Sequence, residues 1–311
     1  MSQRPFERPP YASLPERPRR PHPYFELPAE NLALDSSTFG RMNVHVRRMG
    51  RGPKLVCVHG LMTSSYSFRY LFEPLSKHFE VIAFDLPGAG RSEAPDAPHT
   101  PEALARFLGE VLVALDAEGA RIIGNSMGGY LSMQLALERP ELVGRLVNLH
   151  SPGVPTPRMH ALEGATALPG ARALLSALVA RDPERWAFEN VHYYDESLKS
   201  LEEAREYAAP LHTDAGRRAF FRYLSEALSA RAMRGFVARL ERLGGRFPVP
   251  LQLVYAERDP MVPPEVGRVL GRLLPESELV WLAEGSHFAH VDATERFVAS
   301  ALPFLLEGGA R

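Results

Sequence analysis

Cysteine is almost absent from this chain of 311 residues, which contains only Cys57. A single cysteine excludes an internal disulfide and a zinc site built on several thiolates, and it favours a reducing, cytoplasmic location. Because Cys57 falls within an apolar run, we expect a buried and unreactive thiol. No apolar run reaches the roughly 18 residues that a membrane-spanning helix needs, and the N-terminus lacks the apolar segment of a signal peptide.

The chain also lacks an excess of charge of either sign. It has 36 Lys and Arg residues against 37 Asp and Glu residues, for a formal net charge of -1. Proteins that bind nucleic acids or anionic membranes are usually basic, so neither partner is expected. Residues 1–30 differ from the rest, with eight prolines and five arginines. Proline fixes φ and removes backbone donors, so this stretch is predicted to form an extended arm that is packed on the surface or partly mobile.

Short apolar runs alternate with helical patterns along the remaining chain. The predicted strands cover residues 32–39, 42–49, 55–58, 81–84, 121–123, 146–149, 251–255 and 279–282. The clearest helical patterns cover residues 101–115, 127–138, 264–274 and 292–306. Such apolar runs suit strands that are buried on both faces, and the alternation predicts an α/β fold: a mostly parallel sheet of eight strands flanked by helices.

One long region interrupts this alternation. Between about residues 152 and 235 the sequence shows helical patterns and no strand. We therefore expect a helical lid above the carboxyl ends of the strands, where open α/β sheets bind ligands. The predicted organisation is an arm at 1–30, a core formed by 31–153 and 234–311, and a lid at 154–233.

The segment Gly124-Asn125-Ser126-Met127-Gly128 fits the G-x-S-x-G nucleophile elbow. An apolar strand precedes it and an amphipathic helix follows it, as this motif requires. The glycines leave room for a tight, strained turn that exposes the serine, and the helix start points free N–H groups at developing negative charge. Ser126 is therefore the candidate nucleophile.

A serine hydroxyl needs a base, and the base needs an orienting acid. His287 directly follows the last predicted strand and is the preferred base, with His290 as the rival. Asp259 follows the strand at 251–255 and is the preferred acid, with Glu257 and Asp292 as alternatives. The strand at 146–149 ends in a histidine and a serine, with no acid.

The resulting chain order is serine, aspartate, histidine, which is the order of the α/β-hydrolase fold. Oxyanion donors are expected from the backbone N–H groups of Met127 and Leu61, with Met62 as the second choice. The pocket is expected to include Asn125, Trp186, Tyr193 and Phe288. His287, His290 and Asp292 could imitate a metal cluster, but neither a metal nor an organic cofactor is expected.

The sequence resembles the α/β-hydrolase superfamily, in its lid-bearing serine hydrolase branch. The resemblance covers about residues 35–305. It is carried by the segments Val58-His59-Gly60, Asp85-Leu86-Pro87-Gly88-Ala89-Gly90-Arg91-Ser92, Gly124–Gly129, Asp259 with Val262-Pro263, and Gly285-Ser286-His287-Phe288. It implies a fold and a type of catalytic apparatus but says little about the substrate.

Two branches of the superfamily can be compared with this chain. The turn at residues 59–66 is similar to that of haloalkane dehalogenases, which use an aspartate nucleophile where this chain has Ser126. The elbow also resembles that of the meta-cleavage product C–C hydrolases, which carry a tryptophan where Phe288 stands. Their lid arginine could correspond to Arg205, Arg217 or Arg218.

These observations predict a serine hydrolase that forms an acyl-enzyme intermediate and acts on small or medium carboxylic esters. A C–C bond hydrolase of the meta-cleavage type and a catalytically silent ligand-binding protein are the alternatives. The expected partner is a small-molecule ester, and the chain is expected to be a monomer or a homodimer.

Overall fold

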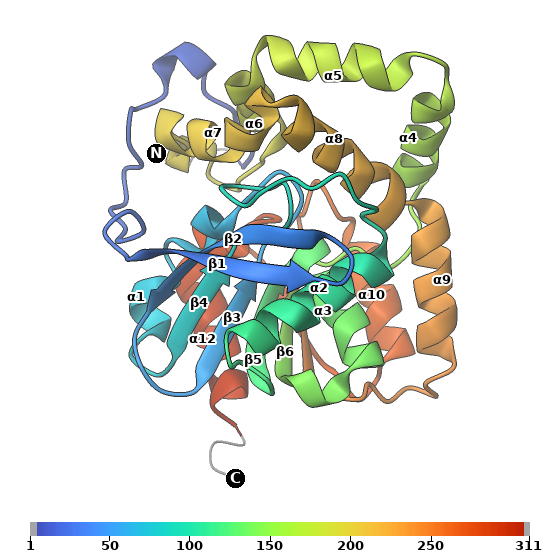
Figure 1. Ribbon diagram of the computed structural model, residues 1–311. Helices are drawn as coiled ribbons and strands as arrows, with labels where there is room; N and C mark the ends of the chain where they lie inside the picture. The colour runs from blue at the N-terminus through green and yellow to red at the C-terminus, as the bar shows by residue number, and fades with distance from the viewer. Residues whose placement is uncertain (1–4, 308–311) are drawn as a thin grey trace.

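An eight-stranded sheet forms the centre of the computed structural model, which describes residues 5–307 except for the side chains of residues 166 and 167 (Figure 1). The strand order is β1-β2-β4-β3-β5-β6-β7-β8. The strands are β1 (Ala29–Ser36), β2 (Gly40–Met49), β3 (Lys54–Val58), β4 (Glu80–Phe84), β5 (Ala120–Asn125), β6 (Val143–Leu149), β7 (Leu251–Ala256) and β8 (Glu278–Leu282). The pairs β1–β2 and β2–β4 are antiparallel, and the other pairs are parallel.

Each of the eight predicted strands overlaps one of these strands, so the predicted mostly parallel sheet is confirmed. The first prediction, 32–39, runs three residues past the end of β1 at Ser36. The strand β1 begins three residues before the predicted start at Leu32, inside the stretch assigned to the arm. The reason is that β1 lies at the edge of the sheet, and its residues alternate between exposed and partly buried positions. An edge strand of this kind has no continuous apolar run to mark its beginning. Cys57 is buried in β3, and this burial raises the pKa of its thiol.

Helices cover both faces of the sheet. The helices are α1 (Phe72–Leu75), α2 (Pro101–Ala114), α3 (Met127–Glu138), α4 (Pro157–Ala167), α5 (Ala171–Arg181), α6 (Pro183–Asn190), α7 (Leu201–Ala208), α8 (Asp214–Arg222), α9 (Ala230–Glu241), α10 (Pro264–Leu273), α11 (Ala289–Asp292) and α12 (Thr294–Leu306). The helices α2, α3 and α10 contribute to one apolar core, and α1 and α12 contribute to a second core with the opposite sheet face.

Local sequence signals explain where several helices begin. Thr100 caps α2 by accepting a hydrogen bond from the Ala103 N–H, and Pro101 occupies the first helical position. The helix predicted over residues 292–306 instead begins at Thr294. It begins late because Asp292 ends the short helix α11 and its carboxylate accepts the N–H groups of Ser286 and Tyr194.

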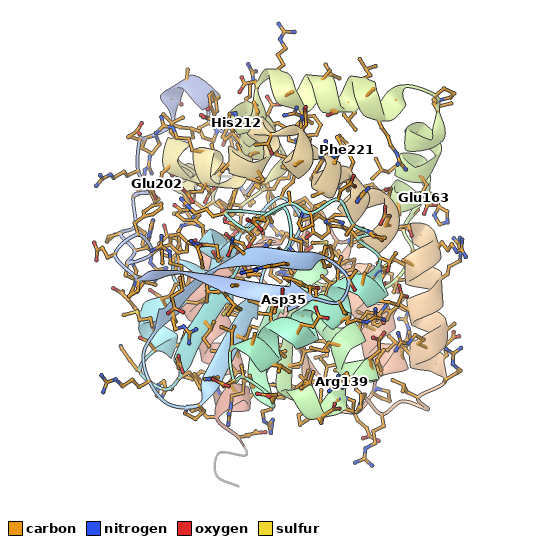
Figure 2. The ribbon with its side chains drawn as sticks, viewed as in Figure 1. Asp35, Arg139, Glu163, Glu202, His212 and Phe221 are labelled. Carbon is orange, nitrogen blue, oxygen red and sulfur yellow. The ribbon has the colours of Figure 1, made fainter. Side chains whose placement is uncertain are left out.

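The helices α4–α9 all lie between β6 and β7, and we call this segment the helical insertion. Figure 1 shows α5–α8 stacked above the end of the sheet, with α4 and α9 descending along one side. Within this part of the described chain there is no strand. Figure 2 shows His212 and Phe221 in this upper layer, with Arg139 near the opposite end of the molecule. The predicted boundary between 233 and 234 falls inside α9, and the division into domains stays a prediction.

The N-terminal segment lies against the helical insertion. The Leu201 N–H donates to the Pro15 carbonyl at 2.9 Å, and the Glu202 N–H donates to the Glu16 carbonyl at 3.0 Å. Further along, the hydroxyl of Tyr24 forms a hydrogen bond of 2.7 Å with the hydroxyl of Ser65 in the core. The segment therefore joins the insertion to the sheet, and backbone hydrogen bonds hold it in place.

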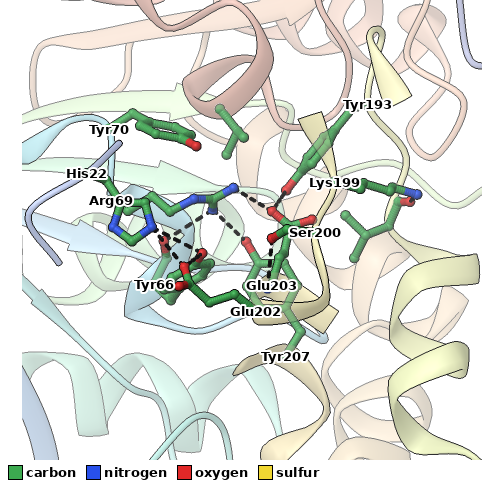
Figure 3. Close-up of polar contacts among 12 residues, drawn as sticks. His22, Tyr66, Arg69, Tyr70, Tyr193, Lys199, Ser200, Glu202, Glu203 and Tyr207 are labelled. Carbon is green, nitrogen blue, oxygen red and sulfur yellow. Dashed lines mark hydrogen bonds and ion pairs between the residues drawn. The ribbon is translucent and has the colours of Figure 1, made fainter. Parts of the chain in front are cut away.

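A buried polar cluster connects these parts of the molecule (Figure 3). Arg69, which follows β3, is fully buried and pairs with Glu203 of α7. Glu203 also accepts a hydrogen bond from the Tyr193 hydroxyl at 2.6 Å. Nearby, Glu202 bonds His22 of the N-terminal segment at 3.0 Å and accepts from the Tyr66 hydroxyl at 2.7 Å. The arm, the insertion and the core thus share one network of charged and hydrogen-bonded groups.

We expect Arg69→Met to destabilise the protein by about 3–5 kcal/mol, because it leaves the Glu203 carboxylate buried without its cation. The double variant Arg69→Met/Glu203→Gln removes both charges and keeps an acceptor for Tyr193, so it should recover much of the loss. Urea unfolding of both variants measures the two values. A single variant no less stable than the double variant would contradict this account.

Candidate active site

The elbow holds Ser126 in a strained conformation between β5 and α3. The serine has φ 53° and ψ -122° and stands at the N-cap of α3. The turn is possible because Gly128 packs against β3, where a Cβ atom on this glycine would lie 2.0 Å from the Val58 carbonyl oxygen. A non-glycine residue at positive φ is held only by the structure around it, and such strain is frequent at functional sites. The elbow predicted from the sequence is therefore present as a backbone conformation.

The histidine and aspartate predicted to work together are in contact. His287 Nδ1 lies 2.7 Å from Asp259 Oδ2, and both side chains are buried. The other carboxylate oxygen, Oδ1, accepts the N–H groups of Met261 at 2.7 Å and Val262 at 2.9 Å. Burial alone would raise the pKa of Asp259, but His287 and these hydrogen bonds hold it below its ordinary value. Asp259 is thus a fixed carboxylate that accepts a hydrogen bond from the Nδ1–H of His287.

The rival residues lie elsewhere. His290 is buried against Phe68, with ring centroids 5.1 Å apart, and neither of its ring nitrogens has a hydrogen-bond partner among the described residues. Glu257 is exposed. Asp292 directs its carboxylate to backbone N–H groups of other loops, and its burial raises its pKa to about 6. The structure therefore pairs His287 with Asp259.

The turn after β3 lies directly against the elbow. A Cβ atom on Gly60 would lie 2.9 Å from the Cβ atom of Ser126. His59 shapes this turn, because its Nε2 accepts the Leu86 N–H at 2.9 Å and its Nδ1 lies 2.8 Å from the Gly60 carbonyl. Within residues 5–307, the N–H groups of Leu61 and Met127 have no hydrogen-bond acceptor. Two free donors thus stand on the two segments that meet at Ser126.

Ser126 and His287 line one cavity of about 160 Å³. Most of its wall is apolar, and the apolar lining residues are Leu61, Met62, Pro152, Met159, Leu162, Val191, Leu224, Leu228, Met261, Val262 and Phe288. The helical insertion supplies one side of this wall, and loops after the strands supply the other. Among the described residues no hydrogen bond joins the Ser126 hydroxyl to the imidazole, and such catalytic contacts are often loose before a substrate binds.

Only one of the four predicted pocket residues, Phe288, lines this cavity; the described side chains of the other three face elsewhere. Asn125 is buried below the elbow and donates to the His287 carbonyl at 2.9 Å. Tyr193 lies in the buried polar cluster with Glu203. Trp186 packs in an apolar cluster that joins the insertion to the turn after β3. Their sequence positions could not show which way each side chain points.

The three arginines considered for the lid are also absent from the described wall of the cavity. Arg205 pairs with Glu16 of the N-terminal segment, and Arg217 donates to the Leu211 carbonyl at 2.6 Å. Arg218 is exposed. Arg158 of α4 is instead the one arginine or lysine among the described lining residues.

His150, directly after β6, is a residue of the site that was not predicted from the sequence. One ring nitrogen of His150, one ring nitrogen of His287 and one carboxylate oxygen of Asp259 lie within 4.8 Å of one another, a spacing that could suit a metal ion. Both ring nitrogens of His150, however, are engaged with backbone groups, and Nδ1 of His287 is engaged with Asp259. These three ring nitrogens therefore serve as hydrogen-bonding groups in this arrangement, and not as metal ligands. The sequence signal for His150 is its position directly after a buried strand, at a strand end where the orienting acid of the triad could have stood.

Comparison with known proteins places this geometry in a family. Residues 53–294 match the model of the alpha/beta hydrolase fold family. The chain is 29% identical over 252 residues to the uncharacterized hydrolase YugF of Bacillus subtilis, covering 81% of this chain and 89% of that protein. It is 28% identical over 275 residues to a 2-hydroxymuconate semialdehyde hydrolase of Pseudomonas sp. strain CF600, covering 87% and 92%.

Solved structures show the same fold. A thermophilic esterase from Thermogutta terrifontis aligns with a TM-score of 0.69 at 19% sequence identity, covering 89% of this chain and 98% of that one. The family match covers well over half of the chain, and it agrees with the sheet order and the elbow described above. The chain therefore belongs to the alpha/beta hydrolase fold family of hydrolases.

Proposed function

We propose that this protein is a serine hydrolase that cleaves small or medium carboxylic esters through an acyl-enzyme intermediate. The observation that carries the proposal is the buried pair of His287 and Asp259, joined at 2.7 Å beside a cavity that Ser126 also lines. A histidine held in one tautomer by a carboxylate is the base that a serine nucleophile needs.

In the proposed reaction, Ser126 Oγ attacks the ester carbonyl carbon while its proton passes to His287 Nε2. The Asp259 carboxylate stabilises the imidazolium through Nδ1, and the N–H groups of Met127 and Leu61 donate to the oxyanion. His287 then gives the proton to the departing alcohol, which leaves the acyl group on Ser126. A water molecule then attacks the acyl carbonyl carbon while His287 takes its proton. The bond from this carbon to Ser126 Oγ breaks, and His287 returns the proton to Oγ as the carboxylic acid leaves.

The wall of the cavity supports an apolar substrate of modest size. Eleven of its sixteen lining residues are apolar, and the cavity volume is about 160 Å³. Burial of an acyl chain against such a wall is favourable by roughly 25 cal/mol per Å² of apolar surface. The helical insertion supplies much of the wall, which supports its proposed role as a lid.

Hydrolysis of a C–C bond is the second candidate. It is supported by the relative from Pseudomonas sp. strain CF600, a 2-hydroxymuconate semialdehyde hydrolase that aligns over 87% of this chain. Arg158 stands in the cavity wall, although none of the three arginines considered from the sequence does. A catalytically silent ligand-binding role is the remaining alternative, and it uses the same cavity without chemistry.

The cellular location and the oligomeric state of the protein are proposals as well. No helix within residues 5–307 combines the length and the hydropathy needed to cross a membrane. We propose a cytoplasmic location, with which the single cysteine is compatible, and a monomer or homodimer.

Two measurements test these alternatives. A fluorophosphonate probe should label the protein at Ser126, because an activated serine attacks its phosphorus atom. A panel of p-nitrophenyl esters of increasing chain length, assayed beside a vinylogous diketone, should show turnover of the short and medium esters. Turnover of the diketone alone would favour C–C hydrolysis. Absence of both labelling and turnover would support the silent binder and contradict the proposal.

A further inference from the structure

His150 combines three features that are unusual for a residue outside the proposed triad. It is fully buried at the end of β6. Its backbone has φ 52°, a conformation that side-chain-bearing residues rarely adopt. Its ring lies beside the ring of His287, with centroids 5.7 Å apart and planes inclined by 28°. A strained, buried histidine next to the proposed base calls for a physical role.

Its hydrogen bonds determine its tautomer. The Ala256 N–H, at the end of β7, lies 2.6 Å from His150 Nε2, so Nε2 must be the unprotonated acceptor. The ring proton is therefore on Nδ1, which donates to the His287 carbonyl oxygen at 3.0 Å. Asn125 Nδ2 donates to the same carbonyl at 2.9 Å. His150 thus connects the strand that carries it to β7 and to the loop of His287.

This connection holds the main chain of His287, whereas Asp259 holds its ring. The hydrogen bond between His287 Nδ1 and Asp259 Oδ2 fixes the rotation of the His287 side chain. The position of the Cα atom depends on the loop after β8, which is anchored at the His287 carbonyl and at the Ser286 N–H. Both restraints act on His287, which lines the same cavity as Ser126.

We infer that His150 is a positioning residue, a neutral imidazole whose Nδ1–H holds the His287 loop in the geometry that proton transfer from Ser126 requires. The inference rests on the proposed serine hydrolase function and adds to it a residue outside the triad. His150 does not line the described cavity, so it acts through His287 and does not touch the substrate.

The surroundings keep His150 uncharged. Burial, helped by the neighbouring His287, lowers its pKa to about 4 and outweighs the attraction of Asp259. Neutrality is useful here because His287 becomes an imidazolium during the reaction, and a second cation stacked on it would oppose that charge.

Two amide substitutions separate the two hydrogen bonds of His150. His150→Asn places an amide nitrogen near the position of Nδ1, so it keeps the donor to the His287 carbonyl and loses the acceptor for Ala256. His150→Gln places an amide oxygen near the position of Nε2, so it keeps the acceptor and loses the donor. The Asn variant leaves the buried Ala256 N–H unpaired, whereas the Gln variant leaves the His287 carbonyl with the donor from Asn125.

The variants should therefore rank in opposite orders in stability and in rate. The Asn variant should have the lower Tm, because an unpaired buried donor is costly. The Gln variant should have the lower maximal rate of fluorophosphonate labelling, by about 10–100-fold, with an unchanged half-saturating probe concentration. The Asn variant should label at close to the wild-type rate.

Equal labelling rates in the two variants, or a slower rate in the Asn variant, would overturn the inference. Failure of the wild-type protein to be labelled would instead contradict the proposed function. A second measurement needs no variant: ring ¹⁵N shifts of the wild-type protein at pH 7 should show His150 neutral with its proton on Nδ1. An imidazolium, or a proton on Nε2, would overturn the inference even if both variants failed to fold.

Discussion

Ser126→Ala is expected to lower kcat for ester hydrolysis by about 10⁶-fold, as removal of the serine does in other triads. The physical reason is that no other nucleophile is bound in place: the elbow fixes Ser126 at φ 53° beside the free N–H groups of Leu61 and Met127. Residual turnover should come from water in a site that still binds the oxyanion. The measurement is kcat on the best p-nitrophenyl ester of the panel, with fluorophosphonate labelling alongside.

The matched control is Ser132→Ala, in the helix α3 that follows the elbow. The Ser132 hydroxyl donates to the Gly128 carbonyl at 2.7 Å and is buried away from the cavity. Its loss should reduce Tm slightly and leave labelling intact. If Ser126→Ala turns over esters at close to the wild-type rate, Ser126 is not the nucleophile, whatever the control shows.

Asp259→Asn should lower kcat by about 10⁴-fold. The geometry predicts how the amide will be oriented. The Met261 and Val262 N–H groups require an acceptor where Oδ1 now lies, so the amide oxygen takes that place and the amide nitrogen faces His287. An amide N–H donates to Nδ1 of the imidazole, which moves the ring proton to Nε2. A histidine in that tautomer cannot accept the proton of Ser126.

Glu257→Gln is the control for this variant. It makes the same change from carboxylate to amide on the same loop, at an exposed side chain. Its kcat should match that of the wild-type protein. If Asp259→Asn retains more than about a tenth of the wild-type kcat, the carboxylate does not select the tautomer of His287 as proposed.

The sequence was most informative where a physical requirement is local. A strand buried in a parallel sheet is apolar over most of its length, so β3, β5 and β7 could be read directly from short apolar runs. The elbow could be read for a similar reason, since only glycine fits where a Cβ atom would lie 2.0 Å from the Val58 carbonyl. The edge strand β1 lacks such a requirement, and its beginning was missed.

Strand ends also gave information about the site, although they lie far apart in the chain. Parallel strands bring their carboxyl ends to one edge of the sheet, so Asp259 and His287 could be expected to lie close together. The same reasoning applies to His150, but the hydrogen bonds of its ring depend on the backbone of β7 and of the His287 loop. No sequence pattern specifies those distances.

The sequence by itself thus determined the order of strands and helices, the strained serine turn and the edge of the sheet where polar side chains collect, because each depends on neighbouring residues or on strand direction. Only the tertiary structure decided which side chains face the cavity. The Tyr193 hydroxyl donates to Glu203, and the Asn125 amide donates to the His287 carbonyl. Arg158, in contrast, lines the cavity. Side-chain direction in an inserted helical layer depends on how the helices dock on the sheet, and that docking is a balance of contacts between segments distant in the chain.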